Sequence, residues 1–137
     1  MPLFRITVRR GRTPAQLRAL ADAIHEVAVR SFNVPEKDRF QIIEQREAHE
    51  LFYDPDYMGV KRTDEIVFLQ ISAGKVRTTE TKLNFYRDLA KSLEEQCGLA
   101  PDNLFVVINT SGAEDWSFGR GRAQMYQPSN PTLAAGE

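Results

Sequence analysis

The stretch that decides the fold is PLFRITVRRGRTPAQL, residues 2–17. Residues 3–9 alternate between apolar and polar side chains, and this period of two is typical of a half-buried strand. Thr13 then has the position of a helix N-cap, with Pro14 at the first helical position and Gln16 completing a capping box. The stretch therefore predicts a strand that leads through a short turn into an amphipathic helix.

The predicted helix continues to about residue 32, because its apolar side chains recur on one face. These side chains are Leu17, Leu20, Ala21, Ile24, Ala28 and Phe32. We expect Asn33-Val34-Pro35 to end the helix and residues 39–44 to form a second strand. The first half of the chain thus has the order strand, helix, strand.

The same order recurs 65 residues later in the chain. Residues 66–71 are almost all apolar and predict a strand that is buried on both faces. Thr78 is expected to cap a second helix, which Gly98 ends, and residues 104–108 predict the fourth strand. The apolar face of this helix is expected to consist of Leu83, Tyr86, Leu89, Ala90, Leu93 and Cys97. Matching positions keep their chemical type between the halves: Arg12-Thr13 with Arg77-Thr78, Leu20 with Phe85, Ile24 with Leu89, Ala28 with Leu93, Phe40 with Phe105, and Ile42-Ile43 with Val107-Ile108.

The repeat defines the fold class. A strand, a helix and a returning strand pair the two strands in parallel. Two such units, about residues 2–46 and 64–110, predict an α+β fold in which a four-stranded sheet carries both helices on one face. The other face of the sheet is left uncovered, which favours a homo-oligomer. We expect a single domain over residues 1–127 and a tail, residues 128–137, that only a partner subunit would order.

Composition excludes several classes of protein. The 137 residues suit one domain with a real core. The 18 basic and 19 acidic residues nearly balance, so no general attraction to nucleic acid or to anionic membranes is expected. The single cysteine, Cys97, excludes an internal disulfide framework and is expected to be a buried, inert thiol. No secretory signal or long apolar stretch is evident, which predicts a soluble cytoplasmic protein.

Pro2 is the first candidate for chemistry. Cytosolic processing commonly removes a methionine that precedes a proline, and the nitrogen of Pro2 would then be a free secondary amine. Since α-amino groups titrate near ~8 and shift with their surroundings, this amine could act as a general acid or as a base. Alternatively, Pro2 only begins an edge strand, where its missing N–H does no harm. Its counterpart in the second half, Val67, lies inside the chain and cannot supply such an amine.

Three charged residues are candidates for a site around Pro2. Arg77 directly precedes the second helix cap, where its guanidinium and the helix N-terminus both favour binding of a carboxylate. Lys75 adds a second cation on a glycine-containing turn. Asp38 precedes a strand expected beside the first one, so its carboxylate could stabilise a cationic Pro2. The alternatives are solvated turn charges at Lys75 and Arg77, and a turn aspartate paired with a neighbouring basic residue.

Two aromatic residues, Trp116 and Phe118, follow the last predicted strand. They could form the apolar wall of a pocket that excludes water, or they could fill a subunit interface. His25 lies on the flank of the first predicted helix, and we interpret it as a packed structural residue. Patterns typical of phosphate loops, dinucleotide sites, Ser-His-Asp triads and zinc sites are absent from the sequence.

These features together resemble the tautomerase superfamily, and most of all its malonate semialdehyde decarboxylase family. The resemblance rests on Pro2, the doubled strand–helix–strand plan, Arg77 before the second cap, and Asp115-Trp116-Ser117-Phe118-Gly119. It covers about residues 2–126 and is strongest at residues 34–40, 77–82 and 115–119. The chain departs from one branch of the family in having Lys75 where a second arginine can stand. This departure weakens the assignment of the substrate more than the assignment of the site.

The resemblance implies a β-α-β-β-α-β fold assembled as a homotrimer, with no metal or organic cofactor. Carried over by position, Pro2 is the acid or base, Asp38 tunes or positions it, and Arg77, helped by Lys75, holds the carboxylate of a small substrate. The aromatic pair at residues 116 and 118 walls the pocket.

The leading hypothesis is a decarboxylase of a small 3-oxo acid such as malonate semialdehyde, in which cationic Pro2 is the general acid. The closest alternative is a keto–enol tautomerase of 2-oxo acids such as phenylpyruvate, in which neutral Pro2 is the general base. Hydration is a third activity that the same residues could support. An alternative of another class is a non-catalytic trimeric binding module that retains the fold.

Overall fold

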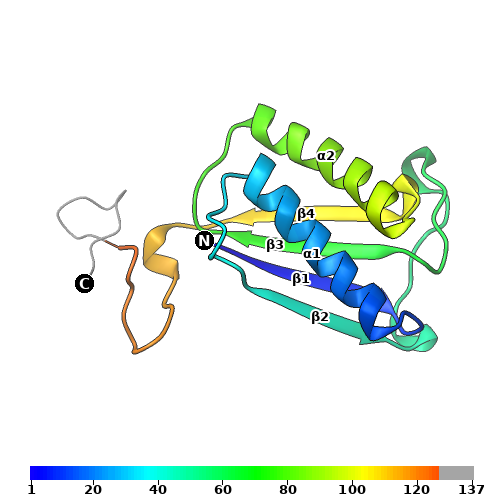
Figure 1. Cartoon of the computed structure of the whole chain (residues 1–137), viewed down its shortest axis with the longest axis horizontal. Coiled ribbons are helices and arrows are strands. Elements are labelled where there is room, and N and C mark those ends of the chain that lie inside the picture. The colour runs from blue at the N-terminus through cyan, green and yellow to red at the C-terminus, as the bar shows by residue number, and fades with distance from the viewer. Residues whose placement is uncertain (127–137) are drawn as a thin grey trace.

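The main elements follow one another in the order that the repeat predicts (Figure 1). In this computed structural model, residues 1–126 are described, so the expected tail, residues 128–137, lies outside the described part of the chain. The elements are β1 (Pro2–Arg9), α1 (Pro14–Ser31), β2 (Gln41–Arg46), β3 (Val67–Ala73), α2 (Thr79–Cys97) and β4 (Leu104–Thr110). The fold is therefore α+β, with two helices and four strands in tandem β-α-β units.

The four strands form one mixed sheet in the order β2-β1-β3-β4. Each repeat unit supplies a parallel pair, β1 with β2 and β3 with β4, as the sequence predicts. The two units meet through the antiparallel pair β1 and β3, in which Pro2 lies opposite Ala73. This register places the start of the chain directly beside the loop that follows β3.

Both helices cover the same face of the sheet (Figure 1), and the core lies between the two layers. Alternate side chains of β1 and β3 point into this core, among them Phe4, Ile6, Leu69 and Ile71. α1 and α2 pack against each other. At the far end of α1, the ring of Phe32 stacks on that of Phe85 with centroids 4.4 Å apart.

The predicted helix ends are confirmed by local hydrogen bonds. Thr13 caps α1 by accepting a hydrogen bond from the backbone N–H of Gln16, whose side chain accepts one from the N–H of Thr13. Thr78 accepts the equivalent bond from the N–H of Thr81 at the start of α2. Gly98 ends α2 in the left-handed conformation, with φ of 66°, which glycine adopts without steric cost.

Three expectations about the elements were wrong. β3 is buried on one face only, because Gln70 and Ser72 point away from the helices and are exposed. β2 begins at Gln41 rather than at residue 39, since the Arg39 side chain turns toward α1 and donates a hydrogen bond to Asp22 at 2.6 Å. The core face of α2 contains Phe85, whereas Leu83 is 53% exposed.

Two further features concern membrane association and the long connection between the repeat units. Among residues 1–126, no helix has both the length and the apolar character needed to cross a membrane. The segment between β2 and β3 contains two short 3₁₀ turns, Ala48–Glu50 and Tyr57–Gly59, and lies at the end of the sheet away from the N-terminus.

Residues 83 and 85 of α2 give a test of which side of this helix faces the core. We expect Phe85→Ala to lower the free energy of unfolding by about 3–5 kcal/mol, because it removes a ring that stacks on Phe32 inside the core. The matched control, Leu83→Ala on the exposed side of the same helix, should cost less than about 1 kcal/mol. Urea denaturation at one fixed protein concentration measures both values, and similar costs for the two variants would contradict the assignment.

Candidate active site

A cavity of about 420 Å³ opens at the end of the sheet where β1 begins and β3 ends. Its walls come from four separate parts of the chain: the N-terminus, the turn after α1, the loop after β3, and the segment after β4. The residues that line it are Met1, Asn33, Pro35, Asp38, Phe40, Lys75, Arg77, Phe118, Gln124 and Met125. Asp38, Lys75, Arg77 and Phe118, all singled out in the sequence, are therefore brought together here.

Met1 fills the inner end of this cavity. Its side chain is buried, and its terminal ammonium group forms an ion pair and hydrogen bond with the carboxylate of Asp38. The Met1 carbonyl oxygen accepts a hydrogen bond from the backbone N–H of Gly74 at 2.9 Å. Pro2 lies buried directly behind Met1, at the first position of β1. The terminal amine and Asp38 thus meet one residue ahead of the Pro2 nitrogen.

The turn that carries Asp38 is held from several sides. The backbone N–H of Asp38 donates to the carbonyl of Pro35 at 3.0 Å, which closes the turn. The Nε2 atom of His25 on α1 lies 2.8 Å from the carbonyl oxygen of Glu36. On the other side, Arg39 is bonded to Asp22 of α1. His25 therefore has the structural place expected of it, and the Asp38 carboxylate is fixed by the packing of its turn against α1.

Arg77 is a buried cation, only 8% exposed. Its Nε atom donates to the carbonyl of Phe32 at 2.8 Å, and its Nη1 atom donates to the carbonyl of Lys75 at 3.1 Å. The guanidinium carbon lies 4.0 Å from the centroid of the Phe32 ring, a cation–π arrangement. Within residues 1–126, nothing accepts a hydrogen bond from its Nη2 group. One edge of the guanidinium is therefore anchored, and donors remain for a ligand in the cavity.

The electrostatics of Arg77 follow from this position. Burial lowers the pKa of the Arg77 guanidinium, and the negative charge of Asp38 partly opposes that change. An arginine remains charged under these conditions because its ordinary pKa is so high. Lys75 is exposed at the rim and forms no ion pair with any described residue. The cavity consequently has a buried, anchored cation and an exposed one at its rim.

The aromatic residues form one side of the cavity. The rings of Trp116 and Phe118 stack with centroids 5.9 Å apart, and Phe118 in turn lies 6.1 Å from Phe40. Phe118 lines the cavity directly, whereas Trp116 supports it from behind and donates a hydrogen bond from Nε1 to Ser111 Oγ at 2.8 Å. Of the two interpretations open from the sequence, this arrangement favours a pocket wall.

Sequence reasoning missed five lining residues: Asn33, Pro35, Phe40, Gln124 and Met125. Gln124 has a definite structural role, since its Oε1 accepts from the N–H of Phe118 and its Nε2 donates to the carbonyl of Gly119, both at 2.9 Å. These bonds hold the turn that carries Phe118. Residues 112–126 have no regular periodicity, so no sequence signal could have placed Gln124 or Met125.

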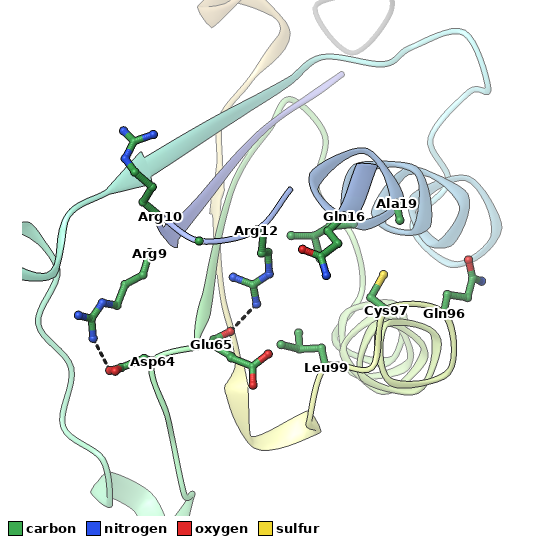
Figure 2. Close-up of a pocket in the computed structure, with 12 residues that line it drawn as sticks. Arg9, Arg10, Arg12, Gln16, Ala19, Asp64, Glu65, Gln96, Cys97 and Leu99 are labelled. Carbon is green, nitrogen blue, oxygen red and sulfur yellow. Dashed lines mark hydrogen bonds and ion pairs between the residues drawn. The ribbon is translucent and has the colours of Figure 1, made fainter. Parts of the chain in front are cut away.

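A second cavity, of about 580 Å³, lies at the opposite end of β1 (Figure 2). Three arginines gather there, and each already has a polar partner. Arg9 forms an ion pair with Asp64, and Arg12 donates from Nη2 to the carbonyl of Glu65 at 2.8 Å. Arg10 is paired with Glu47. This cavity therefore holds two arginines in ion pairs and a third bonded to a backbone carbonyl. In the first cavity no described carboxylate forms an ion pair with Arg77 or Lys75, and an amine and an apolar wall are also present.

Cys97 borders this second cavity rather than lying wholly inside the core. Burial raises the pKa of its thiol, and the charge of Arg12 lowers it in part. The thiol therefore favours its unreactive neutral form, in keeping with the inert residue expected from the sequence. Residues 1–126 contain no cluster of three or more side chains suited to hold a metal ion.

Comparison with known proteins shows which family the chain belongs to. A family model described as tautomerase enzyme matches residues 38–119, and a related model of the same description matches residues 2–61. The chain belongs to the tautomerase superfamily. The resemblance stated from the sequence is thereby confirmed, and the superfamily is one of enzymes, which weighs against a non-catalytic binding module.

Individual tautomerase-superfamily proteins are similar over almost the whole chain. The probable tautomerase YusQ of Bacillus subtilis (strain 168) is 41% identical over 127 residues, which cover 93% of this chain and all of YusQ. A malonate semialdehyde decarboxylase is 37% identical with a TM-score of 0.84, covering 89% of this chain and 94% of that one. The FG41 malonate semialdehyde decarboxylase, inhibited by 3-bromopropiolate, is 33% identical with a TM-score of 0.83, covering 89% and 92%.

Proposed function

We propose that this protein is a cofactor-independent decarboxylase of a small 3-oxo acid, similar to malonate semialdehyde, with Pro2 as its general acid. One observation carries the proposal: a single cavity contains the terminal amine of the chain, the carboxylate of Asp38 and the unfilled donors of Arg77. The proposal requires removal of Met1, which would transfer the terminal amine to Pro2. The similarity to two malonate semialdehyde decarboxylases supports the choice of substrate class.

The proposed reaction begins with binding of the substrate carboxylate. Arg77 donates to its oxygens from Nη2, and Lys75 adds charge at the rim. The ammonium group of Pro2 donates a hydrogen bond to the 3-carbonyl oxygen. The bond between the carboxylate carbon and C2 then breaks, and its electron pair forms the enolate as CO2 leaves. The Pro2 ammonium or water then supplies a proton to C2, which gives the aldehyde product. Negative charge therefore moves from the carboxylate toward Pro2.

Asp38 and the aromatic wall have separate roles in this mechanism. The Asp38 carboxylate, held by its turn, stabilises the cationic form of Pro2 as it stabilises the ammonium of Met1. Phe118 and Trp116 limit the water around the carboxylate, which favours its conversion into neutral CO2. Water admitted near Asp38 would instead allow hydration of a suitable substrate.

Keto–enol tautomerisation of 2-oxo acids such as phenylpyruvate is the second candidate. The similarity to YusQ, named as a probable tautomerase, favours it. In that reaction neutral Pro2 removes a proton beside the carbonyl and returns it at another atom. The positive charges of Lys75 and Arg77 favour a neutral Pro2 amine, whereas the negative charge of Asp38 favours the cation. Tautomerisation requires the first effect to be larger, and decarboxylation requires the second.

We further propose that three chains assemble as a homotrimer through the sheet face that the helices leave open. That face includes exposed apolar side chains on β2 and β4, namely Ile42, Phe105 and Val107. Phe68 of β3 lies against Phe105 there, with tilted rings whose centroids are 5.0 Å apart. A sheet with apolar groups on both faces gains stability when both are covered.

Arg77 provides the first test of the proposed site. Intact mass spectrometry first checks that Met1 has been removed, and a panel of 3-oxo and 2-oxo acids is then assayed. Arg77→Ala should lower kcat/KM by about 10²-fold or more, because a neutral side chain cannot hold the carboxylate. Pro2→Ala should retain partial activity, because its terminal nitrogen is a primary amine. Val76→Ala, on the same loop but 86% exposed, is the matched control and should retain wild-type activity. Wild-type turnover by Arg77→Ala would remove the assigned anion site.

The pH dependence of kcat/KM separates the two candidate reactions. A general acid must be protonated, so decarboxylation should decline as the pH rises through the pKa of the Pro2 amine. A general base must be neutral, so tautomerisation should decline as the pH falls. Profiles with a 3-oxo acid and a 2-oxo acid measure this directly. Activity lost only below about pH 7 would rule out the cationic-acid mechanism.

The assembly is tested by sedimentation equilibrium of the processed protein. We expect a mass three times the 15.6 kDa of the single chain. Val107→Asp places a charge on the open sheet face and should yield a smaller species. Leu83→Asp, on the outward side of α2, is the control and should leave the assembly intact. A wild-type protein that sediments as a monomer at all concentrations would contradict the homotrimer.

A further inference from the structure

The backbone N–H of Gly74 is aimed at the place where the substrate of Pro2 must bind. It donates to the Met1 carbonyl oxygen at 2.9 Å. The Met1 carbonyl carbon is bonded to the Pro2 nitrogen, so standard bond lengths put this oxygen about 2.2 Å from that nitrogen. An oxygen that accepted a hydrogen bond from a free Pro2 amine would lie about 2.8 Å from that nitrogen, which is about 0.6 Å farther than the Met1 carbonyl oxygen.

Removal of Met1 would take away the acceptor of this hydrogen bond. Gly74 is buried beneath Met1, so its N–H would be left without a partner at the inner end of the cavity. A buried donor in this position favours any ligand that brings an oxygen to it. Processing therefore does two things at once: it creates the amine of Pro2 and exposes a second donor beside it.

The orientation of this donor does not depend on Met1. The Gly74 N–H and the Ala73 carbonyl belong to the same planar peptide unit. That carbonyl accepts hydrogen bonds from the N–H of Ser111 at 2.8 Å and from its Oγ at 3.1 Å. Trp116 Nε1 donates to the same Oγ at 2.8 Å, which fixes the hydroxyl. The peptide plane is thus held from its far side, and the N–H stays directed toward the space that the Met1 carbonyl oxygen occupies.

A side chain at residue 74 would be crowded. A Cβ atom there would lie 2.5 Å from the Met1 side-chain carbon Cε, a contact that ends when Met1 is removed, and 3.0 Å from Trp116 Nε1, a tight contact that remains. Close approach of a ligand to the backbone is a known reason for a glycine at a fixed site.

We propose that the backbone N–H of Gly74 and the ammonium group of Pro2 donate hydrogen bonds to the same substrate carbonyl oxygen. This inference rests on the proposed function for its substrate class, a small oxo acid. In both candidate reactions negative charge develops on that oxygen as the enolate forms. Two preorganised donors at this oxygen stabilise the transition state more than the ground state. Gly74 thereby becomes a catalytic residue through its backbone alone.

An amide-to-ester replacement at residue 74 tests this directly. Glycolic acid incorporated in place of Gly74 removes the N–H and adds no side chain. We expect kcat to fall by about 10²-fold, the usual effect of losing one donor to a developing oxyanion. The inhibition constant of propanoate, which has a carboxylate and no second oxygen group, should stay within about twofold. The same replacement at the exposed Val76 is the matched control and should leave kcat unchanged.

Nuclear magnetic resonance on the unmodified protein gives a second measurement. In the processed chain, the Gly74 amide proton should exchange with solvent faster than in a chain that retains Met1. Malonate, whose second carboxylate supplies an oxygen at the carbonyl position, should slow that exchange and shift the resonance. Propanoate should do neither, although both compounds bind at Arg77. A Gly74 amide that responds equally to both compounds would overturn the proposal.

The outcomes separate this inference from the proposed function. Turnover of an oxo acid at the wild-type rate by the residue-74 ester would overturn the Gly74 proposal and leave the enzyme assignment intact. Absence of turnover on every oxo acid, with a Gly74 amide that still responds to malonate alone, would support the donor site and contradict the assigned reaction.

Discussion

The antiparallel pairing of β1 with β3 is the contact on which the site depends. Each β-α-β unit closes its own parallel pair, but only this pairing joins the units into one sheet. Its register sets Pro2 opposite Ala73, so the chain start lies beside the loop with Gly74 and Arg77. A slip of two residues would keep the core faces matched yet move Pro2 by about 7 Å along β3, because strands rise about 3.4 Å per residue.

The charges around the cavity suit the proposed movement of electrons. The terminal ammonium, Lys75 and Arg77 outweigh the single carboxylate of Asp38, so the cavity is cationic before a ligand enters. A substrate carboxylate compensates one of these charges. When CO2 leaves, that negative charge reappears on the carbonyl oxygen, closer to the amine and to the Gly74 N–H. The anchored Arg77 and the fixed peptide at residue 74 therefore mark the beginning and the end of the charge movement.

Sequence periodicity sufficed for the fold because each element carries its own local signals. Thr13 and Thr78 mark helix starts, and alternation marks β1. Periodicity did not show that Phe85 rather than Leu83 faces the core, because the residue that stacks on Phe85, Phe32, lies at the end of the other helix. Asp38 could be expected near Pro2 from strand adjacency, and Arg77 from the family resemblance. Gln124 and Gly74 could not, since Gln124 acts through its side chain on an irregular turn and Gly74 through a backbone bond to the distant Met1.

Met1 explains why the proposed chemistry requires a processed chain. As long as Met1 is present, the nitrogen of Pro2 is part of a planar amide and has neither a proton to give nor a basic electron pair. The same residue neutralises Asp38 with its ammonium, accepts the Gly74 N–H with its carbonyl, and fills the inner cavity with its side chain. Each of these contacts has a counterpart in the proposed enzyme: the Pro2 ammonium, the substrate carbonyl oxygen, and the substrate itself. Met1 thus occupies the groups that the proposed catalysis uses, namely the Asp38 carboxylate, the Gly74 N–H and the space for the substrate. Cleavage of the one peptide bond between Met1 and Pro2 would make all of them available together.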